Sequence, residues 1–321
     1  MIAMLNIKKT RNILGIIKIH LKAIHQFKKL ELVKLGAIDK RKVNVFMIAV
    51  MRNERLRLSY FVNYYRRLGV THFLLVDNNS SDGCIDLVKS MPDVTIFKTD
   101  ESYARAVQGY LWSIGVADRF CNNQWCVIAD IDELLIYPEC ESIILSRLIN
   151  VLESKGQLAL RAFLLDLYSK GRIEKSIIKE GENPLNTLRY FSPIDPRELF
   201  ERDYFSSSMR QKFFGIENQL IKYPFIKYSF FRIFIPGHHA IRFSATLSIT
   251  GAVLHTKFAH DIIPRAVEES ERKEHYMQAY HFRSIHETLK KNPYLSLYSK
   301  DSIEYKDSKQ LVDLGYMKKI E

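Results

Sequence analysis

Apolar runs of strand length alternate with helical stretches from residue 43 onward. Residues 43–51, 72–76, 94–97 and 125–129 each form an almost uninterrupted apolar run. Between the first two runs, Leu58, Phe61 and Val62 recur at the three- and four-residue spacing of a helix. Strands that are apolar on both faces and alternate with helices predict a doubly wound, mostly parallel α/β sheet. We also expect helices over about 102–120, 142–154 and 266–289, and a further strand over 157–167.

Polar clusters follow three of the four predicted strands. They are Arg52–Asn53–Glu54, Asp77–Asn78–Asn79 and Asp130–Ile131–Asp132–Glu133. Ligands of parallel α/β sheets bind beyond the carboxyl ends of the strands. The sequence therefore predicts that these separated residues meet along one edge of the sheet and form a binding site there.

Asp130 and Asp132 flank a single residue directly after a buried strand. Two carboxylates so close repel each other, and a hard cation such as Mn²⁺ or Mg²⁺ relieves that repulsion. A cation there can also neutralise a diphosphate as it leaves. The same pattern occurs as a plain solvated turn, but its position at the end of a strand favours a metal site.

Further segments along the chain follow the polar clusters in a fixed order. The whole series is Arg52–Asn53–Glu54, Asp77–Asn78–Asn79–Ser80–Ser81–Asp82–Gly83, Gln108–Gly109–Tyr110, Trp125 with Asp130–Ile131–Asp132–Glu133–Leu134, Leu165–Asp166–Leu167–Tyr168, Met209–Arg210–Gln211–Lys212–Phe213–Phe214–Gly215 and Leu254–His255–Thr256–Lys257–Phe258. In this order the segments resemble glycosyltransferase family 2, specifically a bacterial branch with a DxDE motif. The resemblance covers about residues 43–318, and the broad family often has a glycine where Asn79 stands. Paired glycines of the branch are replaced here by Ser207–Ser208.

The resemblance implies a GT-A fold and a set of site residues. Asp77 resembles the acid that accepts a hydrogen bond from the nucleotide base, and Asp130 and Asp132 resemble the metal and diphosphate site. His255 resembles a late histidine that completes the metal coordination, although a histidine satisfied by its neighbours is an equal alternative. Further substrate-binding candidates are Asn53, Glu54, Asn79, Gln108 and Arg210. Arg210 suits the donor diphosphate or, alternatively, a surface ion pair.

An inverting transferase also needs a carboxylate that takes the proton of the acceptor hydroxyl. Asp166, Asp195, Asp203 and Glu217 are candidates. We favour Asp166, because it lies near the end of the predicted strand that follows the metal motif. Its alternative role is a turn cap.

The positive charge is concentrated at the N-terminus. Residues 1–42 hold 11 Lys and Arg against Glu31 and Asp39, which gives +9 of the net +12. A nucleic-acid-binding domain carries its basic stripe on the folded body, so we expect no nucleic acid partner. Apolar residues at helical spacing among the lysines predict an amphipathic helix, too interrupted by charge to span a bilayer. Such a helix either lies on an anionic membrane surface or packs against the protein's own body. We expect that a chain beginning near Lys42 keeps its fold.

The four cysteines, at positions 84, 121, 126 and 140, form no CxxC pair and no zinc-binding spacing. Free thiols suit a reducing compartment, so we expect a cytoplasmic protein, peripheral on the inner face of the plasma membrane.

Together these observations divide the chain into a basic extension (1–42), a nucleotide-sugar-binding half (43–168) and an acceptor-side region of the same catalytic domain (169–321). They predict a metal-dependent, inverting glycosyltransferase. It would move a sugar from a nucleotide-sugar donor to a glycan or lipid-linked acceptor in bacterial surface polysaccharide or lipopolysaccharide assembly. Two alternatives are a sugar nucleotidyltransferase and a non-catalytic membrane-surface binding protein. The first normally has a glycine-rich loop after its first strand, and Met51–Arg55 contains no glycine.

Overall fold

The computed structural model describes residues 2–39, 44–201, 209–217, 219–234 and 248–320. In these residues a nine-stranded sheet has the order β1-β4-β3-β2-β5-β9-β7-β10-β6, and a second sheet pairs β8 with β11. The strands are β1 (Glu31–Lys34), β2 (Val45–Met51), β3 (His72–Asp77), β4 (Val94–Lys98), β5 (Trp125–Ile128), β6 (Glu133–Ile136), β7 (Ala159–Asp166), β8 (Tyr190–Phe191), β9 (Ile221–Lys227), β10 (Thr250–His255) and β11 (Ile303–Glu304).

The large sheet is mostly parallel, as the sequence predicts. β4, β3, β2 and β5 are parallel neighbours, and β7 is parallel to β10. Because β9 runs antiparallel to both β5 and β7, these two parallel groups point the same way. β1 and β6 run antiparallel at the two edges. The α/β fold class with a mostly parallel sheet is confirmed.

Helices cover both faces of the sheet, which explains why its central strands are apolar throughout. Along β2, Met47 and Ala49 face a core shared with α2, α3 and α5, whereas Phe46 and Ile48 face a core shared with α1 and α4. The helices are α1 (Ile2–Phe27), α2 (Arg55–Arg67), α3 (Cys84–Val88), α4 (Tyr110–Phe120), α5 (Leu145–Ser154), α6 (Pro196–Glu201), α7 (Met209–Phe214), α8 (Ile262–Arg272), α9 (Tyr276–Lys291) and α10 (Ser308–Asp313).

Two predicted helices differ from the observed ones at left-handed residues. α4 begins at Tyr110 and not near 102, because Val107, Gln108 and Gly109 have φ values of 55°, 54° and 73°. A right-handed helix cannot pass through that conformation. The segment expected as one helix over 266–289 is likewise two helices, since Lys273 ends α8 at φ 56°.

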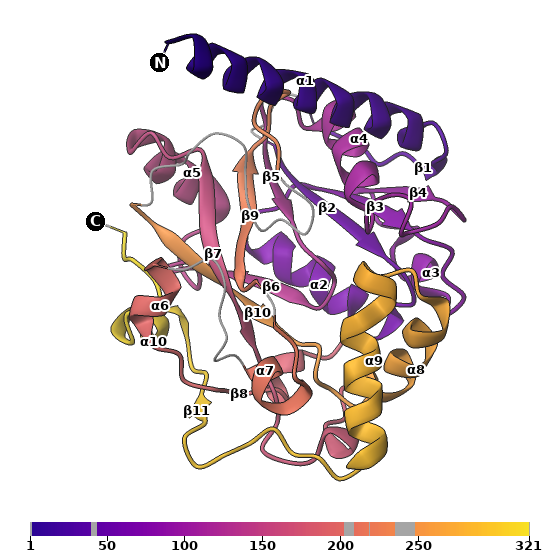
Figure 1. The fold of residues 1–321 in the computed structure, drawn as a ribbon, viewed down its shortest axis with the longest axis vertical. Helices are drawn as coiled ribbons and strands as arrows, with labels where there is room; N and C mark the ends of the chain where they lie inside the picture. Colours follow the sequence, from indigo (N-terminus) through magenta and orange to yellow (C-terminus); the bar gives the residue numbers. More distant parts are fainter. Residues whose placement is uncertain (1, 40–43, 202–208, 218, 235–247, 321) are drawn as a thin grey trace.

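The N-terminal segment belongs to the α/β body. Figure 1 shows α1 lying across α4, and the side chains of Ile16 and Ala23 are fully buried in that contact. His20 is paired with Asp118 of α4 at 2.7 Å. The strand β1 that follows extends the sheet by pairing with β4. A chain beginning near Lys42 would therefore lose a packed helix and an edge strand, and these contacts argue against the expectation that it keeps its fold.

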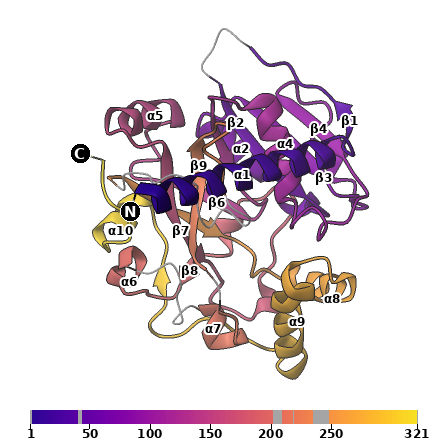
Figure 2. The same ribbon diagram turned by 45° about the horizontal axis from the view of Figure 1, so that its top comes forward.

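The region after residue 169 also contributes to the large sheet. β9 lies between β5 and β7, and β10 lies on the other side of β7. α7, α8 and α9 gather at the end of the molecule away from α1 (Figures 1 and 2). No helix in the described part of the chain has the length and apolarity required to cross a bilayer.

Candidate active site

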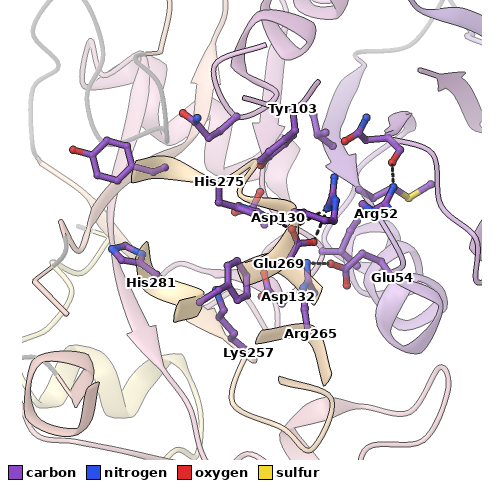
Figure 3. Close-up of a pocket in the computed structure, with 18 of the residues that line it drawn as sticks. Arg52, Glu54, Tyr103, Asp130, Asp132, Lys257, Arg265, Glu269, His275 and His281 are labelled. Atoms are coloured by element: carbon purple, nitrogen blue, oxygen red, sulfur yellow. Dashed lines mark hydrogen bonds and ion pairs between the residues drawn. The ribbon is translucent and has the colours of Figure 1, made fainter. Parts of the chain in front are cut away.

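A pocket of about 200 Å³ lies beyond the carboxyl ends of β2 and β5, and α8 and α9 form its opposite wall (Figure 3). It gathers residues that are far apart in the sequence, as the topology of a parallel sheet predicts. Its polar and aromatic lining comes from the loops after β2 and β3 (Arg52, Glu54, Asn78), the turn before α4 (Tyr103, Gln108), the loop after β5 (Asp130, Asp132), the end of β10 and the loop after it (His255, Lys257), α8 (Arg265, Glu269, Arg272) and α9 with the residue before it (His275, Tyr276, His281, Phe282).

The carboxylate loop is held against the end of β10. The backbone N–H of Thr256 donates to the carbonyl oxygen of Asp132 at 2.7 Å, and the Thr256 hydroxyl donates to the same oxygen at 3.0 Å. This places Nε2 of His255 3.3 Å from Oδ2 of Asp132. Burial opposes the ionisation of Asp132, but the charge of His255 outweighs it and holds the pKa of Asp132 well below its usual range. Asp132 is therefore an ionised carboxylate on the pocket wall.

Asp130 differs from Asp132 in exposure. Its side chain is 56% exposed, whereas that of Asp132 is 11% exposed. Asp130 also borders a neighbouring cavity of about 190 Å³ that Gln108, Tyr110 and Lys222 help to line. Asp130 is thus the accessible carboxylate between two adjoining hollows.

Behind His255 lies a buried ion network. The guanidinium of Arg210 donates to both oxygens of Asp166, at 2.7 and 2.5 Å, and Nδ1 of His255 lies 2.6 Å from Asp166. Burial opposes a charge on Asp166, but Arg210 and His255 outweigh it and lower the pKa of Asp166 far below its usual range. Burial also opposes a charge on His255, and Asp132 and Asp166 together raise its pKa.

This network changes the roles expected for Asp166 and Arg210. Neither residue lines the pocket, and each satisfies the other. A carboxylate whose pKa is so low is a weak proton acceptor, so the geometry does not favour Asp166 as the general base. The fork of Arg210 points at Asp166 and Arg210 does not line the pocket, so the geometry does not favour it as a ligand of the diphosphate.

The other base candidates lie elsewhere. Asp195 pairs with Arg197 at the surface at 2.6 Å, and Glu217 is exposed outside the pocket. Asp203 and Ser207–Ser208 fall outside the residues that the structure describes.

The side chains of Asp130, Asp132 and His255 carry donor atoms that suit a divalent cation, although they do not form a complete metal site in this structure. In the described residues no group of three or more His, Cys, Asp or Glu side chains is arranged to hold a metal ion. Asp132 and His255 are nevertheless adjacent, and Asp130 lies on the same wall. Carboxylate oxygen and imidazole nitrogen are ordinary ligands of Mn²⁺. With Nδ1 on Asp166, the ring of His255 is held so that Nε2 faces Asp132, as in histidines that bind metals.

Further cationic side chains line the pocket, among them Lys257 and Arg265, which the sequence did not identify. Arg265 of α8 pairs with Glu54 at 2.6 Å, and Nζ of Lys257 lies 4.1 Å from the ring centre of Phe282. Burial, reinforced by the charge of Arg210, lowers the pKa of Lys257 to about 8. Lys257 stands inside a block that carried the family resemblance and could have been chosen from it. No sequence pattern marks Arg265.

The pair Glu54–Arg265 joins the two sides of the pocket. Glu54 is buried, and burial raises its pKa to about 6, even though Arg265 opposes the shift. Its second oxygen, Oε2, has no hydrogen-bond partner. Asn53, in contrast, lies outside the pocket lining: its Oδ1 accepts a hydrogen bond from the N–H of Ser81 at 2.9 Å and so ties the two loops together.

A third hollow, of about 200 Å³, continues from the pocket along the loops after β3 and β4. Arg52, Asn78, Asn79 and Tyr103 contribute to it, and Arg52 donates to the carbonyl oxygens of Asn78 and Asn79 at 2.9 and 2.8 Å. Asp77 lies fully buried next to these residues, and its Oδ1 has no hydrogen-bond partner. An unpaired buried carboxylate oxygen is costly unless a donor reaches it.

Comparison with known proteins gives little further guidance. No family model and no curated protein matches this chain. In solved structures, the chain is similar to 4-diphosphocytidyl-2C-methyl-D-erythritol synthase (15% identity over 43% of this chain and 67% of that one, TM-score 0.25). It is also similar to HddC from Yersinia pseudotuberculosis (14% identity, 44% and 71%, TM-score 0.27) and to a nucleotidyl transferase from Methanothermobacter (11% identity, 41% and 64%, TM-score 0.23). At such low TM-scores these similarities assign no activity to this chain.

Proposed function

We propose that this protein is a glycosyltransferase that binds a nucleotide-sugar donor with a divalent cation, Mn²⁺ or Mg²⁺, in the pocket between the carboxylate loop and α8. The observation that carries the proposal is the gathering of opposite charges in that pocket. Ionised Asp132 lies beside His255, and the cationic side chains of Lys257 and Arg265 line the same pocket. A metal-bound diphosphate presents the matching charges, because it is a cation and an anion side by side.

The donor's parts fit different regions of the site. The base would lie in the hollow along Asn78 and Asn79. Asp77 precedes these residues and does not itself line the hollow, but its unpaired Oδ1 is the acceptor that a donor on the base would reach. The diphosphate would lie between the carboxylate loop and Lys257, whose ammonium matches its charge. The sugar would extend toward Asp130 and Gln108, which border both the pocket and the adjoining cavity.

The residues that would hold the cation are Asp132, His255 and, after a side-chain movement, Asp130. When bound, the cation stabilises the negative charge that develops on the departing nucleoside diphosphate. Asp166 would serve this site as a positioning residue, because it fixes the ring of His255 through Nδ1. Arg210 keeps Asp166 ionised for that role.

The resemblance to the bacterial branch of family 2 supports the wider setting. On that basis we propose an inverting reaction on a glycan or lipid-linked acceptor in surface polysaccharide or lipopolysaccharide assembly. We place the protein in the cytoplasm, peripheral on the inner face of the plasma membrane.

A donor screen distinguishes this function from its alternatives. The protein is incubated in parallel with a panel of nucleotide-sugars and with nucleoside triphosphates plus sugar phosphates, each with Mn²⁺, Mg²⁺ or excess chelator, and the products are separated. A glycosyltransferase releases a nucleoside diphosphate, whereas a nucleotidyltransferase acts on a nucleoside triphosphate and a sugar phosphate and releases pyrophosphate. Release of pyrophosphate alone would show that the protein is a nucleotidyltransferase and not a glycosyltransferase. Binding without any turnover would support a non-catalytic protein.

A further inference from the structure

Helix α1 has two different apolar faces. Its inner face packs on α4, with Ile16 and Ala23 fully buried. A second set of apolar side chains points to solvent: Leu14, Ile17, Leu21 and Ile24 are 53%, 38%, 62% and 48% exposed. Their spacing of three, four and three residues aligns them on one side of the helix. The amphipathic pattern of the sequence therefore contains more apolar surface than the contact with α4 uses.

The exposed apolar stripe is accompanied by basic residues. Lys18 and Lys22 are exposed, and each directly follows a residue of the stripe; Lys28 is exposed just beyond the end of the helix. The first 42 residues carry +9 of the chain's net +12. An apolar stripe with flanking lysines is typical of a helix that lies in the interface of a bilayer with anionic lipids.

We propose that the outer face of α1 docks on an anionic lipid surface while its inner face holds the helix to α4. The two roles that the sequence left as alternatives are then filled at once by different sides of one helix. A second copy of the chain is a poorer occupant of this face, because it would bring Lys18 and Lys22 of both copies together, and like charges repel. A negatively charged surface complements them.

Docking through α1 also sets the orientation of the pocket. α8 and α9, which form one wall of the pocket, lie at the end of the molecule away from α1 in both views (Figures 1 and 2). A docked α1 therefore holds that wall away from the lipid. If the proposed glycosyl transfer is correct, this orientation suits an acceptor glycan that extends from the membrane. The docking itself does not depend on the enzymatic proposal.

Vesicle sedimentation of the full-length protein tests the docking. Vesicles with about 30% anionic phosphatidylglycerol should bind the protein at low salt and release much of it at high salt, while neutral phosphatidylcholine vesicles bind it far less. The double variant Lys18→Ala, Lys22→Ala should bind about 30-fold more weakly, since each lysine near an anionic surface contributes about fivefold. Leu21→Gln with Ile24→Gln should also lose binding, because both side chains are exposed apolar contacts.

The matched control is Lys290→Ala with Lys291→Ala, two exposed lysines at the end of α9. This control removes the same charge but should bind vesicles like the original protein. Equal binding by the α1 and α9 variants would refute the docking face. So would a dimer in solution that Leu21→Gln with Ile24→Gln converts to a monomer without loss of vesicle binding. Donor turnover without vesicles should be the same in all these proteins, so a failure of docking and a failure of the enzymatic proposal are separable.

Discussion

Replacing Arg210 by Met should destabilise the protein strongly, and the structure gives the size of the effect. The substitution keeps an unbranched side chain of similar length but removes the charge and both hydrogen bonds to Asp166. The side chain of Asp166 is only 5% exposed, so water cannot replace the lost partner. Breaking a buried ion pair on one side costs about 3–5 kcal/mol. Because His255 still contacts Asp166 at 2.6 Å, we expect about 3 kcal/mol.

Urea unfolding followed by tryptophan fluorescence measures this loss, since Trp112 and Trp125 are both buried in the body of the protein. The double variant Asp166→Leu, Arg210→Met should recover much of the stability, because a neutral apolar pair leaves no buried charge uncompensated. Arg197→Met is the control, because Arg197 is 82% exposed in its pair with Asp195 and its loss should leave the unfolding midpoint almost unchanged.

The opposite result would refute this reasoning. If Arg210→Met unfolds at the same urea concentration as Arg197→Met but binds nucleoside diphosphates much more weakly, Arg210 faces the donor. The sequence-based hypothesis for Arg210 would then be correct, and the buried network would not describe the protein in solution.

Three further predictions concern the base site and the attachment of α1. Asp77→Asn should weaken nucleoside diphosphate binding, measured by calorimetry, by about 1–3 kcal/mol, because it removes a charged hydrogen-bond acceptor from the base; unchanged affinity would place the base elsewhere. Gly115→Leu should lower the free energy of unfolding by about 1–3 kcal/mol, because a Cβ at residue 115 would stand 2.8 Å from Cβ of Phe27. Chemical denaturation measures this loss, and an unchanged free energy of unfolding would mean that α1 does not pack on α4. Burial opposes a charge on His20, but Asp118 and a backbone carbonyl raise its pKa above 6.5. The ion pair of His20 with Asp118 therefore stabilises the fold fully below pH 6.5, and this stabilisation is lost as the pH rises past the raised pKa. The difference in unfolding free energy between the original protein and His20→Gln should then shrink with rising pH. A difference that grows with pH would contradict a charged His20 in this pair.

The sequence predicted the sheet and the edge where the site lies because both depend on local patterns. Continuous apolar runs such as 45–51 can be buried on both faces only in a covered sheet. Polar residues directly after such runs must then meet at the carboxyl edge. Asp130 and Asp132 were identified in this way, whereas His255 was identified from the family resemblance, and the structure brings all three to one pocket.

What the sequence could not predict depends on contacts between distant segments. In the sequence, Arg210 cannot be distinguished from an arginine that binds phosphate, and only the fold shows that its guanidinium pairs with Asp166. Arg265 meets Glu54 across 211 residues of sequence, and no spacing rule connects them. Likewise, the lysines and apolar residues of α1 indicate an amphipathic helix, but which apolar residues face α4 depends on the position of Gly115, where the helices approach closely.

Metal-dependent nucleotide binding tests the central claim most directly. Calorimetric titration of a nucleoside diphosphate should show binding with Mn²⁺ that falls at least tenfold in excess chelator. Asp132→Asn should bind equally weakly under both conditions, while the control Asp313→Asn, in an exposed pair on α10, should behave like the original protein. If Asp132→Asn binds the nucleotide with full Mn²⁺ dependence, or if the chelator has no effect on the original protein, the pocket does not hold a metal-bound diphosphate at this carboxylate.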